Sequence, residues 1–355
     1  MAGVPALETA GLSKRYGARF AVDHIDISLP SGVVSGFVGP NGAGKTTTIL
    51  MLLGLVRPTD GTGQVLGQPI TDPAAYLARV GALIEAPLFY PTLSGRRNLE
   101  VLTRLGRLDP TRIAQVLEQV ELSDRAHDLV RSYSLGMKQR LGIAAALLPA
   151  PELVILDEPT NGLDPAGIRE IRELLKGLTE RGITVFVSSH LLAEIEAICQ
   201  HLVMIDKGRI VFQGGVDSLL AAQQTALIAT PEHAKDLPAL IALIEREGKE
   251  ASAEGESVRV QSNADWAAEL NRRAMAAGIT LSGLQVTRAS LEEAFFSVVG
   301  ALRAHGSSPG GEGGLRPHGS SPGGEGGLRP HGSSPGGEHP GEGVAPFPDP
   351  ASGGD

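Results

Sequence analysis

The chain has 355 residues, a hydrophobic fraction of 42% and a formal net charge of −9. This length suits roughly two domains of about 150 residues each, and the acidic balance argues against a positive field that would attract nucleic acid. Cys199 is the only cysteine, which excludes an intramolecular disulfide and favours a reducing compartment.

The sequence shows neither a signal peptide nor a stretch that is long and apolar enough to span a membrane. The first residues lack the positive region and apolar core of a signal peptide. The most apolar long stretch, residues 141–156, is interrupted by Pro149 and Pro151 and is shorter than the roughly 20 residues that a spanning helix needs. We therefore expect that the chain does not cross a membrane.

Residues 6–38 contain short alternating apolar and polar runs, with turn signals at Gly17 and at residues 30–32. This pattern predicts an antiparallel β layer. Tyr16 lies at one of its turns, where an aromatic ring can stack on an adenine or simply pack against its neighbours.

The next stretch satisfies the phosphate-loop pattern GxxxxGK[ST] at every constrained position. It follows the apolar run 33–38, a predicted buried strand, and precedes residues 47–53, which can continue as a helix. Glycines let backbone N–H groups wrap around phosphate oxygens, and the start of the helix adds further donors. We expect Lys45 to reach the outer phosphates and the Thr46 hydroxyl to hold Mg²⁺; a glycine-rich turn that matches by chance is the alternative. The predicted phosphate-binding residues are Gly39, Pro40, Asn41, Gly42, Ala43, Gly44, Lys45, Thr46 and Thr47.

From Tyr76 to about Leu148 the apolar spacing is mostly helical. Within this region Ser134 and Gly136 can open a helix that runs to Pro149. A serine in that place is usually only an N-cap, but the same geometry presents N–H groups to an anion.

Residues 153–158 form an apolar run that ends in two carboxylates, Asp157 and Glu158. This is typical of a strand that is buried on both faces and whose tip reaches a site. We expect Asp157 to hold Mg²⁺ through water and Glu158 to polarise an attacking water; capping of the next turn is the structural alternative. A further run, 183–187, leads to His190, which by itself could be an ordinary polar strand end.

The remaining chain divides into two predicted parts. Residues 218–300 alternate strands and helices in a pattern that fits a small module of βαββα type. From residue 305 the sequence HGSSPGGEGGLRP repeats, and such Gly, Pro and Ser content predicts a disordered tail over 305–355. Its histidines could bind metal weakly, or the repeats could simply be a solvated tail.

The order of these features resembles the ATPase subunit of an ATP-binding cassette (ABC) transporter. The resemblance covers residues 6–215 and includes the loop at Gly39, the Ser134-Leu135-Gly136-Met137 segment, the acidic strand end and His190. It implies an α/β fold: a P-loop NTPase core with an antiparallel β layer and a helical subdomain, followed by the small accessory module and the tail.

The resemblance also implies a role for each site residue. Tyr16 would stack on adenine, Lys45 and Thr46 would hold the phosphates and Mg²⁺ of ATP, and Asp157 would serve the metal. Glu158 would be the catalytic base.

The same resemblance implies that the active site is shared between two copies. His190 would contact the γ-phosphate of the chain's own ATP, whereas Ser134 and Gly136 would contact the γ-phosphate bound by the other copy. Asp164 would lie in the loop that communicates between subunits. Two copies would then close around ATP and open after hydrolysis.

Two departures from the family pattern stand out. The signature segment has Leu135 and Met137 where the family usually has other residues, although its serine and second glycine remain. Glu85 stands where the family normally has a glutamine near Mg²⁺ and the attacking water. A carboxylate can coordinate Mg²⁺ there, but it is also repelled by the γ-phosphate.

Residues 82–99 are similar to the branch that powers exporters of antibiotics, such as bacitracin and daunorubicin exporters. This implies an ATPase on the cytoplasmic face of the cell membrane that drives a separate multi-spanning permease, without a nucleic-acid partner. The alternatives are a soluble ABC protein that acts on ribosomes or nucleic acid, and an ATP-controlled regulator with little turnover.

Overall fold

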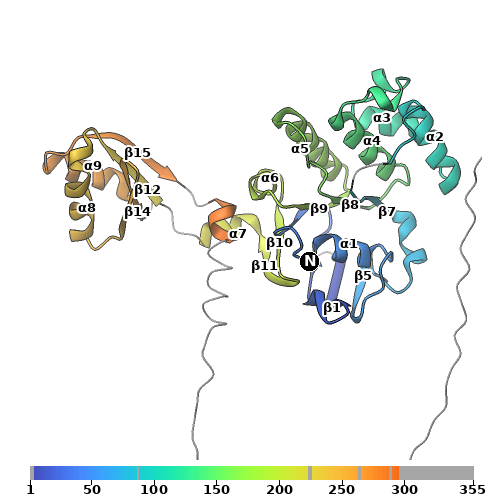
Figure 1. Cartoon of the computed structure of the whole chain (residues 1–355), viewed down its shortest axis with the longest axis horizontal. Helices are drawn as coiled ribbons and strands as arrows, with labels where there is room; N and C mark the ends of the chain where they lie inside the picture. Colours follow the sequence, from blue (N-terminus) through green and yellow to red (C-terminus); the bar gives the residue numbers. More distant parts are fainter. Residues whose placement is uncertain (1–3, 86–87, 223–225, 263–264, 288–289, 296–355) are drawn as a thin grey trace, which may run out of the picture. The chain divides into compact units, whose positions relative to one another are not determined.

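The computed structural model describes residues 4–85, 88–222, 226–262, 265–287 and 290–295. Its central element is a six-stranded sheet in the order β11-β10-β4-β9-β8-β7 (Figure 1). All neighbours in this sheet are parallel except β11, which forms an antiparallel hairpin with β10. The strands are β4 (Val34–Val38), β7 (Val80–Leu83), β8 (Leu153–Asp157), β9 (Thr184–Ser189), β10 (His201–Asp206) and β11 (Arg209–Gly215).

Alternating side chains of this sheet contribute to two separate cores. In β8, Leu153 and Ile155 belong to one core, while Val154 and Leu156 belong to the other. Every residue of β4, β8 and β9 is buried, as expected for strands covered on both faces. The expected strand with carboxylates at its tip is therefore confirmed as a central strand.

One face of the sheet is covered by an antiparallel layer and by α1 (Lys45–Leu52), which share the core around Phe37 and Phe186. The two rings stack with centroids 5.2 Å apart. The layer confirms the prediction for the first part of the chain. Its strands are β1 (Leu7–Tyr16), β2 (Arg19–Ile25), β3 (Ser28–Leu29), β5 (Asp60–Val65) and β6 (Gln68–Pro69), in the order β2-β1-β5-β6 with β3 beside β1.

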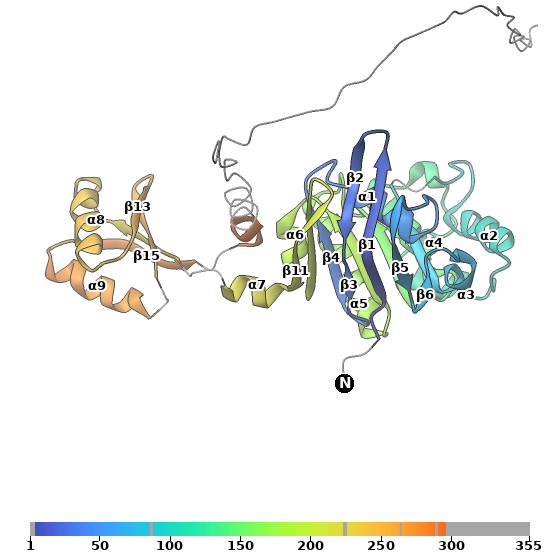
Figure 2. The ribbon, with the colours of Figure 1, turned by 90° about the horizontal axis from the view of Figure 1, so that it is seen from below.

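The other face is covered by α5 (Pro165–Glu180) and neighbouring helices. The helices α2 (Gly95–Gly106), α3 (Arg112–Gln119) and α4 (Leu135–Leu147) form one group (Figures 1 and 2). The region from Tyr76 to about Leu148 contains these three helices, as expected, but the strand β7 precedes them. Short 3₁₀ turns occur at Pro73–Ala75, Leu77–Arg79, Ser123–Arg125, Val130–Ser132 and Ala234–Asp236.

Beyond α6 (Leu192–Glu196) and α7 (Val216–Ala222), residues 226–287 form a module with its own sheet, in the order β13-β14-β12-β15, and its own core. The helices α8 and α9 pack against this sheet. The order of elements is βαββαβ, the ferredoxin-like arrangement, which has one strand more than the predicted βαββα pattern. Its elements are β12 (Ala226–Pro231), α8 (Leu237–Arg246), β13 (Ala251–Glu254), β14 (Ser257–Gln261), α9 (Trp266–Ala276) and β15 (Leu281–Thr287).

Residues 290–295 follow this module but belong to the larger core. Leu291, Ala294 and Phe295 are buried in the core that also contains α5 and β9. The segment begins with a reciprocal cap, because the Glu293 N–H donates to Ser290 Oγ at 3.2 Å and the Ser290 N–H donates to Glu293 Oε2 at 3.1 Å. The sequence had suggested that this segment completes the small module.

The tail predicted for 305–355 lies outside the described residues. Among the residues that are described, no helix is long and apolar enough to cross a membrane.

Candidate nucleotide site

The phosphate loop connects β4 to α1 and is held tightly against the sheet. A Cβ at Gly39 would lie 2.2 Å from the Ile205 carbonyl oxygen, so only glycine fits there. Gly44, which precedes α1, has φ +112°, a conformation that side chains with a Cβ rarely adopt. The loop geometry therefore explains why glycines occupy these two positions.

Lys45 begins α1 and points back into the loop. Its side chain is 6% exposed, and its ammonium donates to the Gly39 carbonyl oxygen at 2.7 Å. The same Nζ lies 3.2 Å from Glu158 Oε1. The cation expected to reach the outer phosphates is thus held beside the carboxylate expected to act as base.

Asp157, at the end of β8, is 3% exposed and is held by two hydroxyl groups. Thr46 Oγ1 donates to Asp157 Oδ2 at 2.7 Å, and the Ser188 hydroxyl donates to Asp157 Oδ1. The Thr46 hydroxyl and the Asp157 carboxylate are hard oxygen donors of the kind that Mg²⁺ prefers. These two residues therefore fit the predicted metal.

Glu158 has a left-handed backbone, with φ +51°. Its N–H donates to Ser188 Oγ at 2.9 Å, and its Oε2 lies 2.8 Å from His190 Nδ1. A non-glycine residue in this conformation is strained, and such strain is frequently found at functional sites. In this conformation the Glu158 carboxylate contacts both Lys45 and His190.

Lys45, Thr46, Glu158 and His190 face a hollow of about 350 Å³. Its lining combines the phosphate loop, the end of β8 and the end of β9, as expected where parallel strands end. The lining residues are Ala21, Asn41, Gly42, Gly44, Lys45, Thr46, Thr47, Glu158, Asn161 and His190.

Gly39, Pro40, Ala43 and Asp157 lie beside the lining residues without lining this hollow themselves, and Tyr16 and Glu85 do not line it either. Tyr16 ends β1 with 55% of its surface exposed, and the Lys14 ammonium lies 5.1 Å from the centre of its ring. Glu85 is exposed and has φ +57°. The structure therefore does not bring either side chain to the phosphate loop.

Ser134 and Gly136 line a second hollow, of about 420 Å³, with Gly162, Leu163 and Asp164. Ser134 caps α4, because its Oγ accepts the Met137 N–H at 3.2 Å. No lining residue is common to this hollow and the phosphate-loop hollow. Within one chain, the signature segment and the phosphate loop are therefore separate surfaces.

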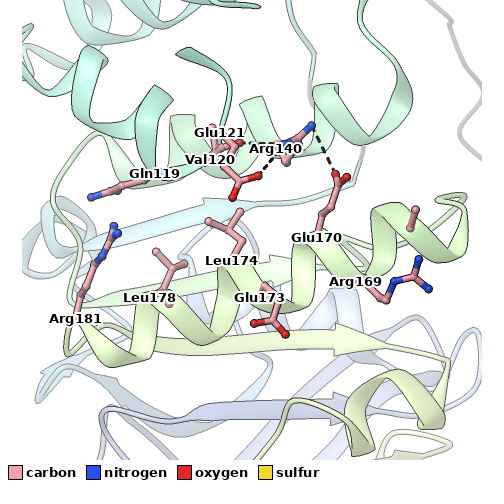
Figure 3. A pocket seen from close by; sticks show the side chains of 12 residues that line it. Gln119, Val120, Glu121, Arg140, Arg169, Glu170, Glu173, Leu174, Leu178 and Arg181 are labelled. Atoms are coloured by element: carbon pink, nitrogen blue, oxygen red, sulfur yellow. Dashed lines mark hydrogen bonds and ion pairs between the residues drawn. The ribbon is translucent and has the colours of Figure 1, made fainter. Parts of the chain in front are cut away.

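A third hollow, of about 470 Å³, lies between α5 and the helical group (Figure 3). Arg140 of α4 crosses it, with its guanidinium 3.6 Å from Glu170 and 3.7 Å from Glu121 (Figure 3). The hollow contains arginines and glutamates in similar numbers along its walls, so it has no dominant charge.

Sequence reasoning missed Ser188 and Asn161. Ser188 bridges Asp157 and the Glu158 backbone, whereas Asn161 lines the hollow. The only sequence signal was their position, Ser188 two residues before His190 and Asn161 three residues after Glu158. A pattern of residue types does not show which neighbouring hydroxyl or amide faces a site.

A phosphate loop between a parallel strand and a helix, with an acidic strand end beside it, defines the class of P-loop nucleotide-hydrolysing proteins. Comparison with known proteins narrows this class. A sequence-family model described as ABC transporter matches residues 22–161. The bacitracin transport ATP-binding protein BcrA of Bacillus licheniformis is 40% identical over 308 residues, which cover 83% of this chain and 97% of the relative.

Solved structures agree with this result. The ATP-binding subunit of an ABC transporter is 30% identical and superposes with a TM-score of 0.55 over 61% of this chain and 92% of that one. A dimeric ATP-binding cassette bound to ADP and inorganic phosphate has the same fold, with a TM-score of 0.52, 23% identity and coverage of 59% and 98%. The chain belongs to the ABC transporter family as one of its ATP-binding proteins, and it is an ATPase.

Proposed function

We propose that this ATPase binds Mg·ATP between two copies of the chain and thereby drives a separate membrane permease. The observation that carries the proposal is the convergence of Lys45, Glu158 and His190 on one hollow, while Ser134 lies in another. The first arrangement can bind and hydrolyse a nucleotide. The second places the N-terminus of α4, which could bind a phosphate, away from the phosphate loop of the same chain.

In the proposed reaction, the N–H groups of the phosphate loop and the Lys45 ammonium bind the phosphates. Glu158 accepts a hydrogen bond from the attacking water, and His190 contacts the γ-phosphate. Thr46 and Asp157 would hold Mg²⁺, which would supply charge neutralisation at the phosphate oxygens. Because Lys45 lies 3.2 Å from Glu158, ATP must compete with this carboxylate for the ammonium. Binding therefore frees Glu158 to act on water.

Tyr16 and Glu85 retain proposed roles at the edge of this site. The exposed ring of Tyr16 is available to stack on adenine. The role of Glu85 as a further Mg²⁺ ligand stays a prediction, and it requires its exposed carboxylate to move toward the metal when nucleotide binds.

The signature segment supplies the argument for a dimer. Ser134 and Gly136 would complete the site of a second copy by donating hydrogen bonds to its γ-phosphate, since they are separate from the phosphate loop of their own chain. A symmetric pair of chains would contain two such shared sites. ATP would then hold the pair together, and hydrolysis would release it.

The proposed cargo is a small antibiotic-like molecule that is exported. Support comes from BcrA, a protein named for bacitracin transport, whose similarity extends over 83% of this chain and so includes the module after the ATPase fold. We propose that the chain works on the cytoplasmic face of the cell membrane, beside a multi-spanning permease and without nucleic acid. In this proposal residues 6–215 are the ATPase domain and residues 218–300 are the accessory domain.

The Glu158→Gln variant tests the proposal. It should lower ATP turnover by at least about 100-fold, because the amide is a poor base, while it keeps ATP affinity and accumulates as a dimer. Light scattering after size exclusion with excess Mg·ATP measures the dimer. Glu180→Gln, an exposed residue at the end of α5, is the matched control and should behave as the unmodified chain.

The outcome that contradicts the proposal is a Glu158→Gln chain that stays monomeric in excess ATP and hydrolyses it normally. The trapped variant can also be captured from detergent-solubilised native membranes. A co-purified multi-spanning protein would support the proposed role in a transporter. Ribosomal proteins or nucleic acid without a permease would instead support the alternative, a soluble ABC protein that acts on ribosomes or nucleic acid.

A further inference from the structure

Glu194 is a buried carboxyl that lies outside the nucleotide hollow. Its side chain is 6% exposed, and its Oε2 accepts a hydrogen bond from Thr160 Oγ1 at 2.5 Å. Thr160 is 8% exposed. Neither residue lines the hollow that contains the phosphate loop, so a direct contact with nucleotide is not their role.

Thr160 belongs to the loop that carries Glu158 at one end and Asp164 at the other. The Asn161 N–H donates to the Glu158 carbonyl oxygen at 3.1 Å, and the Leu163 N–H donates to the Thr160 carbonyl oxygen at 3.1 Å. These bonds make the loop a pair of linked turns. Thr160 and Glu158 therefore belong to the same hydrogen-bonded turn.

Glu194 belongs to α6, the helix that follows His190. The Glu194 N–H donates to the Leu191 carbonyl oxygen at 3.2 Å, and the Leu191 N–H donates to Ser189 Oγ at 3.0 Å. The Thr160–Glu194 hydrogen bond thus joins two segments that are 34 residues apart in the sequence. One segment carries the proposed base and the other carries the histidine that touches it.

The arrangement has an energetic cost. Glu194 Oε1 is buried and has no hydrogen-bond partner among the described residues. A buried polar atom without a partner destabilises the folded state, and such atoms are rare in folded proteins. An apolar residue would fill the same space without this cost. The need to fill this space therefore does not explain the carboxyl, which points to a role for its hydrogen bond.

We propose that Glu194 is a positioning residue for ATP hydrolysis. Through Thr160 it fixes the loop of Glu158 and Asp164 against the segment of His190, so that the base, the histidine and the proposed intersubunit loop keep one geometry. The Glu158–His190 separation of 2.8 Å is the distance that this link maintains. The inference rests on the proposed catalytic roles of Glu158 and His190.

The test compares variants of the full chain that delete the hydrogen bond with variants that keep it. Glu194→Ala and Thr160→Val should each lower kcat by about 10-fold to 100-fold, because small misplacements of reacting groups have effects of this size. The dissociation constant for a fluorescent ATP analogue should stay within two-fold. Glu194→Gln and Thr160→Ser keep an acceptor and a hydroxyl respectively, and should restore most of kcat.

The double variant separates this contact from general damage. If the hydrogen bond is the cause, Glu194→Ala combined with Thr160→Val should be no slower than the slower single variant. Glu196→Ala is the matched control, since it makes the same change on the same helix. The Glu196 carboxyl accepts the Leu291 N–H at 2.9 Å instead of contacting Thr160, so its kcat should stay within two-fold.

Two sets of results would overturn the inference. In the first, the deletions leave kcat unchanged, or their effects multiply as if independent. In the second, Glu196→Ala loses as much activity as Glu194→Ala, which would assign the loss to α6 as a whole. The unmodified chain and Glu158→Gln, measured in the same assay, identify failure of the proposed function separately: it fails if these two turn over ATP at equal rates.

Discussion

The side chains expected to act on the γ-phosphate already contact one another. Lys45 and His190 lie 3.2 Å and 2.8 Å from the two carboxylate oxygens of Glu158. The negative charge of Glu158 therefore offsets part of the positive potential of Lys45 that would attract a phosphate. The proposed catalytic groups are therefore paired with one another in this structure, and in the proposed mechanism the nucleotide would replace Glu158 as the partner of Lys45.

The proposed phosphate-binding role of Lys45 predicts the effect of the Lys45→Ala variant. Loss of the ammonium should weaken ATP binding by about 10-fold to 100-fold, because a charge-assisted hydrogen bond is lost. Titration with a fluorescent ATP analogue measures this change. Lys176→Ala, an exposed change on α5, should leave affinity unaltered. Preserved affinity in Lys45→Ala would refute the assignment of the phosphate loop.

His201 predicts a pH dependence of stability. Its pKa is lowered by burial, and its Nδ1 is buried without a hydrogen-bond partner among the described residues. The unfolded chain takes up a proton at about pH 6.5, whereas the folded chain resists it. The stability that His201 contributes is therefore present above this pH and is lost as the pH falls through it.

The corresponding measurement is urea unfolding at pH 7.5 and pH 5.5. His201→Gln should reduce the loss of unfolding free energy on acidification by no more than about 1.4 kcal/mol per pH unit. Replacement of an exposed histidine, His233→Gln, should leave the loss unchanged. Equal pH dependence in all three chains would contradict the role given to His201.

Among the elements, Arg140 links α4 to α5 across the hollow in Figure 3. Its side chain is 16% exposed, so its stem as well as its charge contributes to packing. Arg140→Ala should lower the unfolding free energy by about 1–2 kcal/mol, measured by urea denaturation. Arg169→Ala, on the exposed side of the same hollow, should change it by less than about 0.5 kcal/mol. Equal effects would mean that Arg140 is no more than a surface charge.

Elements with a strong local pattern could be predicted from the sequence, and elements defined by distant partners could not. The phosphate loop and the strand 153–157 carry patterns that few other structures satisfy. The strand β7 does not, because Val80–Leu83 is short and becomes a strand by pairing with β8 about 70 residues later in the chain. The strand β13, Ala251–Glu254, is largely exposed and lacks an apolar alternation.

The same distinction holds within the site. Residue types and their order indicated Lys45, Asp157 and Glu158, because each belongs to a short pattern with a chemical reason. The Thr160–Glu194 bond joins residues 34 positions apart, and no local pattern connects them. The positions of Tyr16 and Glu85 outside the hollow also depend on how loops pack, which residue type alone does not specify.

For the whole molecule, the segment 290–295 makes a prediction about truncation. A chain that ends at Ala304 should keep its stability and ATPase activity, because the described core is intact. A chain that ends at Thr287 lacks Leu291, Ala294 and Phe295, which are buried in the larger core. Its ATPase fold should lose at least about 2–5 kcal/mol, the usual cost of emptying one large buried site. Thermal unfolding measures both.

The point variant Leu291→Ala provides the matched test without truncation. It should lower the unfolding free energy by about 2–5 kcal/mol, whereas Glu292→Ala, its exposed neighbour, should be nearly neutral. If the shortened chain and Leu291→Ala are both as stable as the full chain, the segment contributes nothing to the ATPase core.

The place of Leu291 and Phe295 in that core has a consequence for synthesis. A ribosome completes the strands, the phosphate loop and the small module before it adds the residues that close the larger core. Until then, the nascent chain exposes the apolar surface that these side chains cover, and exposed apolar surface of this kind promotes aggregation. The core of the ATPase is therefore completed only when nearly the last part of the described chain has been synthesised. A messenger RNA truncated before that point would encode a protein with an incomplete core, which is susceptible to proteolysis.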